Sequence, residues 1–330
     1  MKRLLALLGT ILCLTVPAQA QCVGKNLIAA LSPDDRAALN VQTAKVPHPV
    51  GNYWRATKGN QTITLIGSYH FDDPRHAATM AALTPIITAA TTVLVEAGPE
   101  EEKALKAQIG RDPSLMVITD GPTLIEQLPA ADWAALTTAM RARNVPAFIA
   151  AKFKPWYISV MLGVPPCAMA QATTSKGLDG LIIDAAQSAG VPIKALEPFD
   201  TVFKIFGGLS SADQLSMIHS SLAMEDLGAD YAVTLADTYF SQDTRAIWEF
   251  TRLQSLAVPD ATPDQVNGEF ARMEEALMAK RNRSWIPVIA DAATKGPVFA
   301  AFGALHLSGK DGVLALLERE GFAVERLSLP

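Results

Sequence analysis

The sequence is poor in cysteine, in net charge and in long apolar runs, and each scarcity excludes a class of protein. Three cysteines in 330 residues are too few for a disulfide-rich scaffold. A formal net charge of -5, with the Lys and Arg residues scattered, offers no basic surface for nucleic acid or for an anionic membrane. Beyond the N-terminus, no stretch reaches the roughly 18 uncharged apolar residues of a membrane-spanning helix. The 49% hydrophobic content indicates instead a globular protein with a sizeable core.

The first twenty residues have the three parts of a secretory signal peptide. Met1-Lys2-Arg3 is basic, the stretch from Leu4 to Val16 is apolar, and Ala18-Gln19-Ala20 has the pattern of a cleavage signal. We therefore predict cleavage after Ala20 and a periplasmic or secreted protein. An uncleaved N-terminal anchor is the alternative, although the apolar part is too short to span a bilayer.

Cleavage after Ala20 would leave only two cysteines, Cys22 and Cys167. Because exported proteins fold in an oxidising compartment, one disulfide between them is possible, and a pair of buried free thiols is the alternative. Cys22 also raises the question of lipid attachment, but Gln21 stands where a lipidation signal has a small residue.

The pattern of apolar residues alternates between strand and helix at both ends of the chain, which predicts an α/β fold. Strands are expected at 52–57, 61–66, 91–95, 191–196, 298–302 and 322–327, the first two joined by a turn at 58–60. Helices are expected at 26–38, 76–90, 100–108, 132–143, 177–189 and 310–320, with two more meeting at a kink within 147–162. In the first of them, Ser32-Pro33-Asp34-Asp35 supplies an N-cap and a proline at the first helical position. Four further amphipathic segments, near 211–223, 229–240, 243–255 and 264–293, predict a large helical layer or insertion at about 205–294. We expect a single domain over residues 21–330, with a mixed central sheet flanked by helices.

One short pattern occurs twice, each time just past a predicted strand. Gly67-Ser68-Tyr69-His70 follows the second predicted strand, and Gly303-Ala304-Leu305-His306 follows the fifth. Glu96 and Glu197 likewise follow predicted strands. Because binding sites of open α/β sheets gather beyond the carboxyl ends of the strands, we expect these four side chains to meet. The glycines would let the backbone turn sharply as it leaves the strand, and would let a ligand or a neighbouring chain segment approach closely.

Two imidazoles and one carboxylate are a ligand set that divalent transition metals accept. We therefore predict a metal site formed by His70, His306 and Glu96, with Glu96 alternatively acting as general base on a water. The alternative is that both histidines only make structural hydrogen bonds at the strand ends. Glu197 is the weaker carboxylate, because an acid after a strand is often a helix cap or a solvated charge.

Arg281-Asn282-Arg283 is a further candidate, because an arginine fork can hold a carboxylate or an oxyanion. Such charges also occur on solvated helix faces, which is the alternative. Other catalytic motifs are absent from the sequence: there is no G-x-S-x-G, H-E-x-x-H, C-x-x-C or S-x-x-K pattern.

Taken together, these motifs resemble those of the TraB/PrgY/GumN family, which is related to the Tiki proteases. The resemblance also includes Lys154-Pro155-Trp156, Lys176-Gly177-Leu178-Asp179 and the stretch from Val191 to Glu197, and it extends from about Gly51 to Leu327. It implies an α/β core akin to the erythromycin-esterase, ChaN-like and Tiki folds. The chain is similar to the short exported GumN-like members, since it has no membrane tether of the Tiki kind.

The resemblance implies a metal-dependent hydrolase of peptide bonds, with manganese or cobalt favoured over zinc. It assigns the paired histidines to His70 and His306, the glutamate to Glu96 and the arginine to Arg281. The leading hypothesis is an exported metallopeptidase in which Arg281 orients the substrate or its oxyanion, with Asn282 and Glu197 as further substrate-binding residues. The alternative hypothesis is a non-catalytic protein that binds a peptide, haem or a metal ion in the same cleft.

Overall fold

The structure is a computed structural model, and it describes residues 22–169, 176–257 and 262–329. The predicted signal peptide, residues 1–20 with its cleavage site after Ala20, lies outside the described residues. Within them, no helix is both long enough and apolar enough to cross a bilayer.

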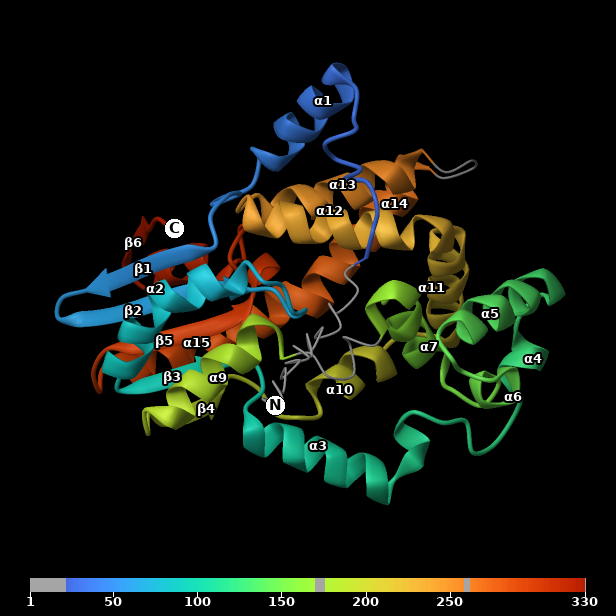
Figure 1. Cartoon of the computed structure of the whole chain (residues 1–330), viewed down its shortest axis with the longest axis horizontal. Helices are drawn as coiled ribbons and strands as arrows, with labels where there is room; N and C mark the ends of the chain where they lie inside the picture. Colours follow the sequence, from blue (N-terminus) through green and yellow to red (C-terminus); the bar gives the residue numbers. More distant parts are fainter. Residues whose placement is uncertain (1–21, 170–175, 258–261, 330) are drawn as a thin grey trace, which may run out of the picture.

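Six strands form one mixed sheet in the described part of the chain, in the order β4-β3-β5-β2-β1-β6 (Figure 1). β1 and β2 form the predicted hairpin, and Gly59 lies in its two-residue turn with a φ of 60°, a left-handed conformation that suits glycine. The strands are β1 (Tyr53–Lys58), β2 (Gln61–Ser68), β3 (Thr92–Val95), β4 (Ile193–Ala195), β5 (Val298–Gly303) and β6 (Ala323–Arg326).

Strands β2, β5, β3 and β4 run parallel to one another, so their carboxyl ends lie at one edge of the sheet. The register of β2 and β5 pairs Ser68 with Gly303, which places the two G-x-x-H motifs side by side. β1 is antiparallel to both of its neighbours, and this makes the sheet mixed. The central strands are buried on both faces, as expected of parallel strands covered by helices.

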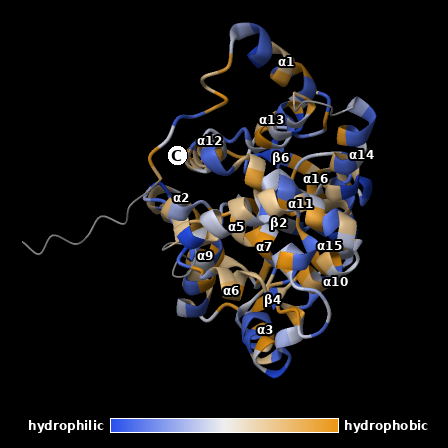
Figure 2. Cartoon of the chain, turned by 90° about the vertical axis from the view of Figure 1, so that its right-hand side faces the viewer, coloured by the Kyte–Doolittle hydropathy of each residue, from blue (hydrophilic) through white to orange (hydrophobic). Residues whose placement is uncertain are grey.

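Helices cover both faces of the sheet. Trp285, Ile289, Leu314 and Leu317 pack with one face, and side chains of α2 and α9 such as Leu83 pack with the other. Figure 2 shows α2 and α9 on one side of the sheet and α15 and α16 on the opposite side. These helices are α2 (His76–Ala89), α9 (Gly177–Ser188), α15 (Lys280–Ala293) and α16 (Val313–Arg319).

A helical layer extends beyond the sheet, on the right in Figure 1. One of its cores joins α5, α6 and α7 to α11, and two smaller cores join α13 to α1 and to α14. In the described part of the chain, the other helices are α1 (Pro33–Thr43), α3 (Pro99–Arg111), α4 (Leu124–Gln127), α5 (Ala130–Ala142), α6 (Ala147–Ala150), α7 (Pro155–Leu162), α10 (Thr201–Gly207), α11 (Ser211–Ala223), α12 (Gly228–Phe240), α13 (Thr244–Leu256) and α14 (Pro263–Glu274). The predicted α/β fold with a large helical layer is confirmed.

The first helix was predicted too early in the chain, at 26–38. It runs from Pro33 to Thr43, with Ser32 as its N-cap: the Ser32 hydroxyl accepts a hydrogen bond from the Asp35 backbone N–H. Proline at the first helical position fits this start, because its missing N–H would have no partner within the helix. The residues before Ser32 run over α12 instead, where the Leu27 N–H donates to Thr234 Oγ1 over 2.8 Å.

Cys22 and Cys167 form a disulfide that ties the start of the described chain to a 3-10 turn, η2 (Pro166–Ala168), in the helical layer. Of the two states left open by the sequence, the disulfide is therefore the one that the structure has. Disulfides of this kind are typical of proteins from oxidising compartments.

Candidate functional site

The two G-x-x-H motifs pack directly against each other at the carboxyl edge of the sheet. A Cβ atom added to Gly67 would lie 2.7 Å from the Cα of Ala304, which is too close for any side chain. A Cβ atom added to Gly303 would lie 3.2 Å from Nε2 of His70 and 3.3 Å from Oε1 of Glu96. Gly303 has an ordinary extended conformation, so its role is close approach rather than a sharp turn.

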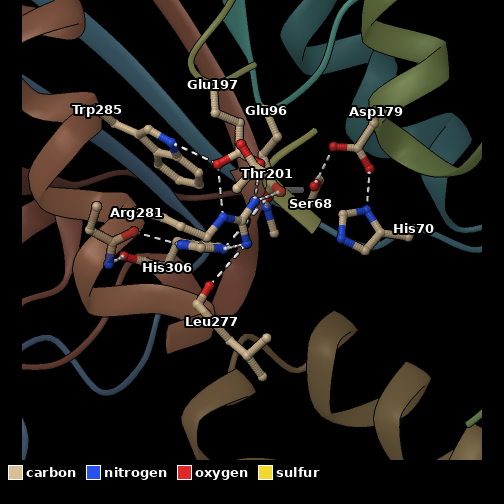
Figure 3. Close-up of polar contacts among 12 residues, drawn as sticks. Ser68, His70, Glu96, Asp179, Glu197, Thr201, Leu277, Arg281, Trp285 and His306 are labelled. Carbon is tan, nitrogen blue, oxygen red and sulfur yellow. Dashed lines mark hydrogen bonds and ion pairs between the residues drawn. The ribbon is translucent and has the colours of Figure 1, made fainter. Parts of the chain in front are cut away.

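His70 is oriented by Asp179, the first acid of α9 (Figure 3). The ring Nδ1 donates to Asp179 Oδ2 over 2.7 Å, and Ser68 Oγ donates to the other carboxylate oxygen over 2.6 Å. Burial lowers the pKa of His70, but the hydrogen bond and charge of Asp179, together with Glu96, raise it to about 9. Since Nδ1 faces Asp179, the other ring nitrogen, Nε2, is the one directed at Gly303 and Glu96.

The start of α9 reaches His70 only because residue 177 is glycine. Gly177 has a φ of 52°, and a Cβ atom there would lie 2.4 Å from the carbonyl of His70. The Leu178 N–H donates to the carbonyl of Tyr69 over 2.9 Å. Helix α9 and the first G-x-x-H motif are therefore joined backbone to backbone.

His306 is oriented by Asn282 on α15. Its Nδ1 lies 2.6 Å from Asn282 Oδ1, which fixes Nδ1 as the donor and Nε2 as the acceptor. The Asn282 amide donates to the carbonyls of His306 and Asp311, over 3.3 and 2.9 Å. Burial lowers the pKa of His306 to about 4, although the charge of Glu96 opposes this, so the ring is neutral near pH 7. Asn282 is only 1% exposed, so in this structure it positions His306 rather than facing a substrate.

Glu96 follows β3 directly, and both of its carboxylate oxygens have partners. Oε1 accepts from the Gly303 backbone N–H over 2.6 Å, and Oε2 accepts from Arg281 Nη2 over 2.6 Å. His306 Nε2 lies 3.8 Å from Oε1. Burial raises the pKa of Glu96, but the charges of His306, Arg281 and His70 outweigh it and lower the pKa to about 2. Glu96 is therefore ionised at neutral pH.

Arg281 lies at the centre of the cluster in Figure 3, and all five of its N–H donors are used. Nε and Nη2 donate to the two oxygens of Glu197 over 2.8 and 2.7 Å. Nη2 also donates to Glu96, and Nη1 donates to the Leu277 carbonyl over 2.9 Å. The remaining contact of Nη1 is with His306 Nε2, over 3.2 Å. Glu197 also accepts from Trp285 Nε1 over 3.2 Å. It thus holds Arg281 through two of the five N–H groups.

A π-helical turn precedes Arg281. Residues Glu275–Ala279 join α14 to α15 through one widened turn, in which the Lys280 N–H donates to the Glu275 carbonyl five residues back instead of four. The carbonyl of Leu277, within this turn, accepts from the Arg281 side chain. The widened turn therefore contributes directly to the orientation of Arg281.

The structure thus brings six residues that the sequence singled out into one cluster: His70, Glu96, Glu197, Arg281, Asn282 and His306. Two further residues of the site, Asp179 and Trp285, were not predicted as site residues from the sequence. Asp179 ends the Lys176–Asp179 motif, but an acid in the first turn of a helix is equally typical of a favourable charge near the helix N-terminus. Trp285 has the spacing of a core residue on α15, which it also is.

The donor atoms of the cluster have the chemistry of a divalent metal site: two imidazoles, each with its Nδ1 bonded to an acceptor of the chain, and one ionised carboxylate. Among the described residues, however, no group of three or more His, Cys, Asp or Glu side chains has the arrangement of a formed metal site. Arg281 contacts both His306 Nε2 and Glu96 Oε2. The donor set fits a metal provided that the ion displaces the proton that the raised pKa of His70 keeps on Nε2, and the guanidinium group of Arg281 bonds the other two members.

Comparison with known proteins gives one positive result. No curated protein matches the sequence significantly. The sequence model of the TraB/PrgY/gumN family matches residues 52–326, a range that begins just before β1 and ends with β6 and that includes every residue of the cluster. Because that match covers well over half of the chain, the protein belongs to the TraB/PrgY/gumN family.

Proposed function

We propose that this protein is an exported, metal-dependent hydrolase of peptide bonds, with its active site at the carboxyl edge of the sheet. The observation that carries the proposal is the convergence of two imidazoles and an ionised carboxylate around Gly303. Each imidazole has its Nδ1 bonded to the chain, by Asp179 or Asn282, as in histidines that hold metals. The Cys22–Cys167 disulfide supports an oxidising compartment.

In this proposal His70, His306 and Glu96 hold manganese or cobalt, in preference to zinc. Such an ion would supply a Lewis acid and an activated water for hydrolysis. Asp179 and Asn282 keep the imidazole rings in place. Glu96 either ligates the ion or accepts a proton from the attacking water. Arg281 carries the charge and the planar donors needed to hold the oxyanion that forms at the scissile carbonyl.

The proposal is tested by metal analysis of the purified protein after loading with Mn²⁺, and by mass spectrometry of a peptide mixture incubated with it. We expect about one ion per chain and cleaved peptides, both lost in the His70→Ala, His306→Ala double variant. His219→Ala is the matched control, because His219 bonds Asp132 in the helical layer, outside the cluster. Equal, near-zero metal in the wild type and the double variant would contradict the metal site.

Glu96→Gln separates the two roles of Glu96. As a ligand, Glu96 is needed for metal affinity, so the amide should reduce the bound Mn²⁺. As a general base, it is needed for proton transfer, so the amide should keep the metal but lower kcat by about 10²- to 10⁴-fold.

A second candidate is a non-catalytic protein that binds a peptide, haem or a metal ion in the same cleft. It is favoured by the saturation of Arg281, whose five donors are all engaged within the chain. Binding of a peptide without turnover across a peptide library, in the presence of manganese or cobalt, would support this candidate over the hydrolase.

A further inference from the structure

The guanidinium group of Arg281 bonds the same atoms that a metal ion would need. Nη1 lies 3.2 Å from His306 Nε2, the nitrogen left as an acceptor by the bond of Nδ1 to Asn282. Nη2 donates to Glu96 Oε2 over 2.6 Å, and Oε1 of Glu96 accepts from the Gly303 N–H. A lone pair that accepts a hydrogen bond cannot ligate a metal at the same time. His306 Nε2 has a single lone pair, so its contact with Nη1 must break before His306 can act as a ligand, whereas each oxygen of Glu96 has a second lone pair.

Arg281 is also held by partners that take no part in metal binding. Glu197 accepts two of its N–H groups in a bidentate pair, over 2.7 and 2.8 Å, and is itself fixed by Trp285 Nε1. The guanidinium carbon lies 5.0 Å from the centre of the Trp285 ring, a cation-π distance. The carboxylate of Glu197 is only 9% exposed and keeps the charge of Arg281 compensated inside the protein. Loss of the contacts with His306 and Glu96 would therefore leave the guanidinium paired.

Their positive charges prevent Arg281 and a divalent ion from lying against His306 and Glu96 at the same time. Like charges repel strongly at about 4 Å in the partly buried surroundings of a protein, and a divalent ion doubles the effect. Glu96, Glu197 and Asp179 carry three negative charges, which Arg281 and His70 together do not balance. The cluster thus retains a charge deficit that a further cation can fill, provided that Arg281 moves toward Glu197.

We propose that Arg281 is a built-in counter-cation of this site, which bonds His306 and Glu96 until a divalent metal displaces it onto Glu197. The inference rests on the proposed metal site and adds a competition between that metal and a residue of the chain. After displacement, the Nη donors released from His306 and Glu96 are the ones left to bind a substrate oxyanion. Metal binding and substrate recognition are then coupled through a single side chain.

The test measures Mn²⁺ affinity by isothermal titration calorimetry for the wild type, Arg281→Gln and Arg283→Gln. Glutamine removes the charge at 281, so we expect the affinity to rise at least about tenfold. Arg283→Gln is the matched control, because Arg283 lies on the same helix but pairs with Glu275 and Asp311 outside the cluster. It should leave the affinity within about twofold of the wild type.

An unchanged or weaker affinity of Arg281→Gln, with the wild type still binding Mn²⁺, overturns the competition and leaves the proposed metal site standing. No Mn²⁺ binding by either protein overturns both. A crystal structure of the wild type with Mn²⁺ covers the case in which Arg281→Gln fails to fold. Arg281 should then bond Glu197 and be out of hydrogen-bond range of His306 Nε2, and persistence of that contact beside the bound ion would overturn the inference.

Discussion

At the scale of single residues, Asp179 determines which nitrogen of His70 faces the cluster. Its carboxylate accepts from Nδ1 and is itself fixed by Ser68. Asp179→Asn keeps the shape but removes the negative charge and allows the ring to turn. We expect Mn²⁺ affinity to fall by about 10- to 100-fold, as for other losses of a partner that orients a metal-binding histidine. Isothermal titration calorimetry measures this change.

Asp184→Asn is the control for this prediction, since Asp184 lies on the same helix and makes an exposed pair with Lys176. It should change neither Mn²⁺ affinity nor thermal stability. If Asp179→Asn lowers the melting temperature strongly but keeps the Mn²⁺ affinity of the wild type, Asp179 has a structural role rather than a positioning one.

His76 lies outside the cluster, and its burial should make the stability of the protein depend on pH. It begins α2, is 2% exposed, and its Nε2 donates to the Phe71 carbonyl over 3.0 Å. Burial lowers its pKa from the ordinary 6.5, against the opposing effects of the Phe71 hydrogen bond and of Asp73, Asp72 and Asp179. Below about pH 6.5 the unfolded chain therefore binds a proton that the folded state resists, so stability falls as the pH falls. Urea unfolding between pH 5 and pH 7.5 measures this loss.

The variant to compare with the wild type is His76→Phe, because the ring at this position lies among the aromatic rings of Tyr69, Tyr239 and Phe240. The variant cannot take up a proton at this position, so its unfolding free energy should fall less between pH 7.5 and pH 5 than that of the wild type. Between pH 7.5 and 8.5 the difference between the two proteins should stay constant. Parallel curves over the whole range would show that His76 does not contribute to the pH dependence.

The sequence points to the two glycines of the G-x-x-H motifs, but it does not show which structural role they have. Two roles were expected together, a sharp turn of the backbone and a close approach of another group. The structure supports the second, since the space that a Cβ would fill at Gly67 belongs to Ala304, and that at Gly303 faces His70 and Glu96. Each glycine makes room for the other motif, a relation that neither motif reveals alone.

At the scale of elements, the π-helical turn before α15 explains how one helix can serve both the core and the cluster. Deletion of Ala276 would convert the five-residue turn to an ordinary α-helical turn, with α14 and α15 kept in their own packing positions. We expect the variant to fold, but with Arg281 no longer bonded by the Leu277 carbonyl and hydrolysis reduced at least about tenfold. Circular dichroism and peptide cleavage measure the two effects.

A deletion of equal size in an α-helical part of the same segment is the control. Glu269 is exposed on α14, where no widened turn absorbs the change, so its deletion should rotate Val266 out of the core and lower the melting temperature. If deletion of Ala276 proves as destabilising as deletion of Glu269, the π turn is needed for folding and not specifically for Arg281.

The strands and most helices were predictable because each is a local pattern of apolar residues. The strand ends before His70, Glu96, Glu197 and His306 come directly from such patterns. For the first helix the cap at Ser32 and Pro33 was predicted, but the range began too early, because the residues before Ser32 are apolar at intervals and pack on α12 through separate contacts such as Leu27 with Thr234. Helical spacing alone cannot distinguish those two uses of the same residues.

At the scale of the whole molecule, the order of the strands could not be derived from the sequence. β5 lies between β2 and β3, although more than two hundred residues separate it from either of them along the chain. No local pattern specifies such a parallel pairing. It is nevertheless what makes the cluster, because Gly303 at the end of β5 lies between His70 and Glu96. The convergence of strand ends was predictable as a rule of α/β sheets, whereas the contacts of Arg281 required the actual order.

The disulfide gives the last prediction, which concerns the stability of the whole chain. Cys22 and Cys167 are 145 residues apart, so the bond restricts a large part of the unfolded ensemble. We expect the Cys22→Ser, Cys167→Ser double variant to lose about 2–5 kcal/mol in the free energy of unfolding, measured by urea titration. The wild type in reductant should lose a similar amount, and reductant should not affect the double variant. A loss smaller than about 0.5 kcal/mol would mean that the contacts of the N-terminal segment with α12, such as Leu27 with Thr234, already hold it in the unreduced and reduced protein alike.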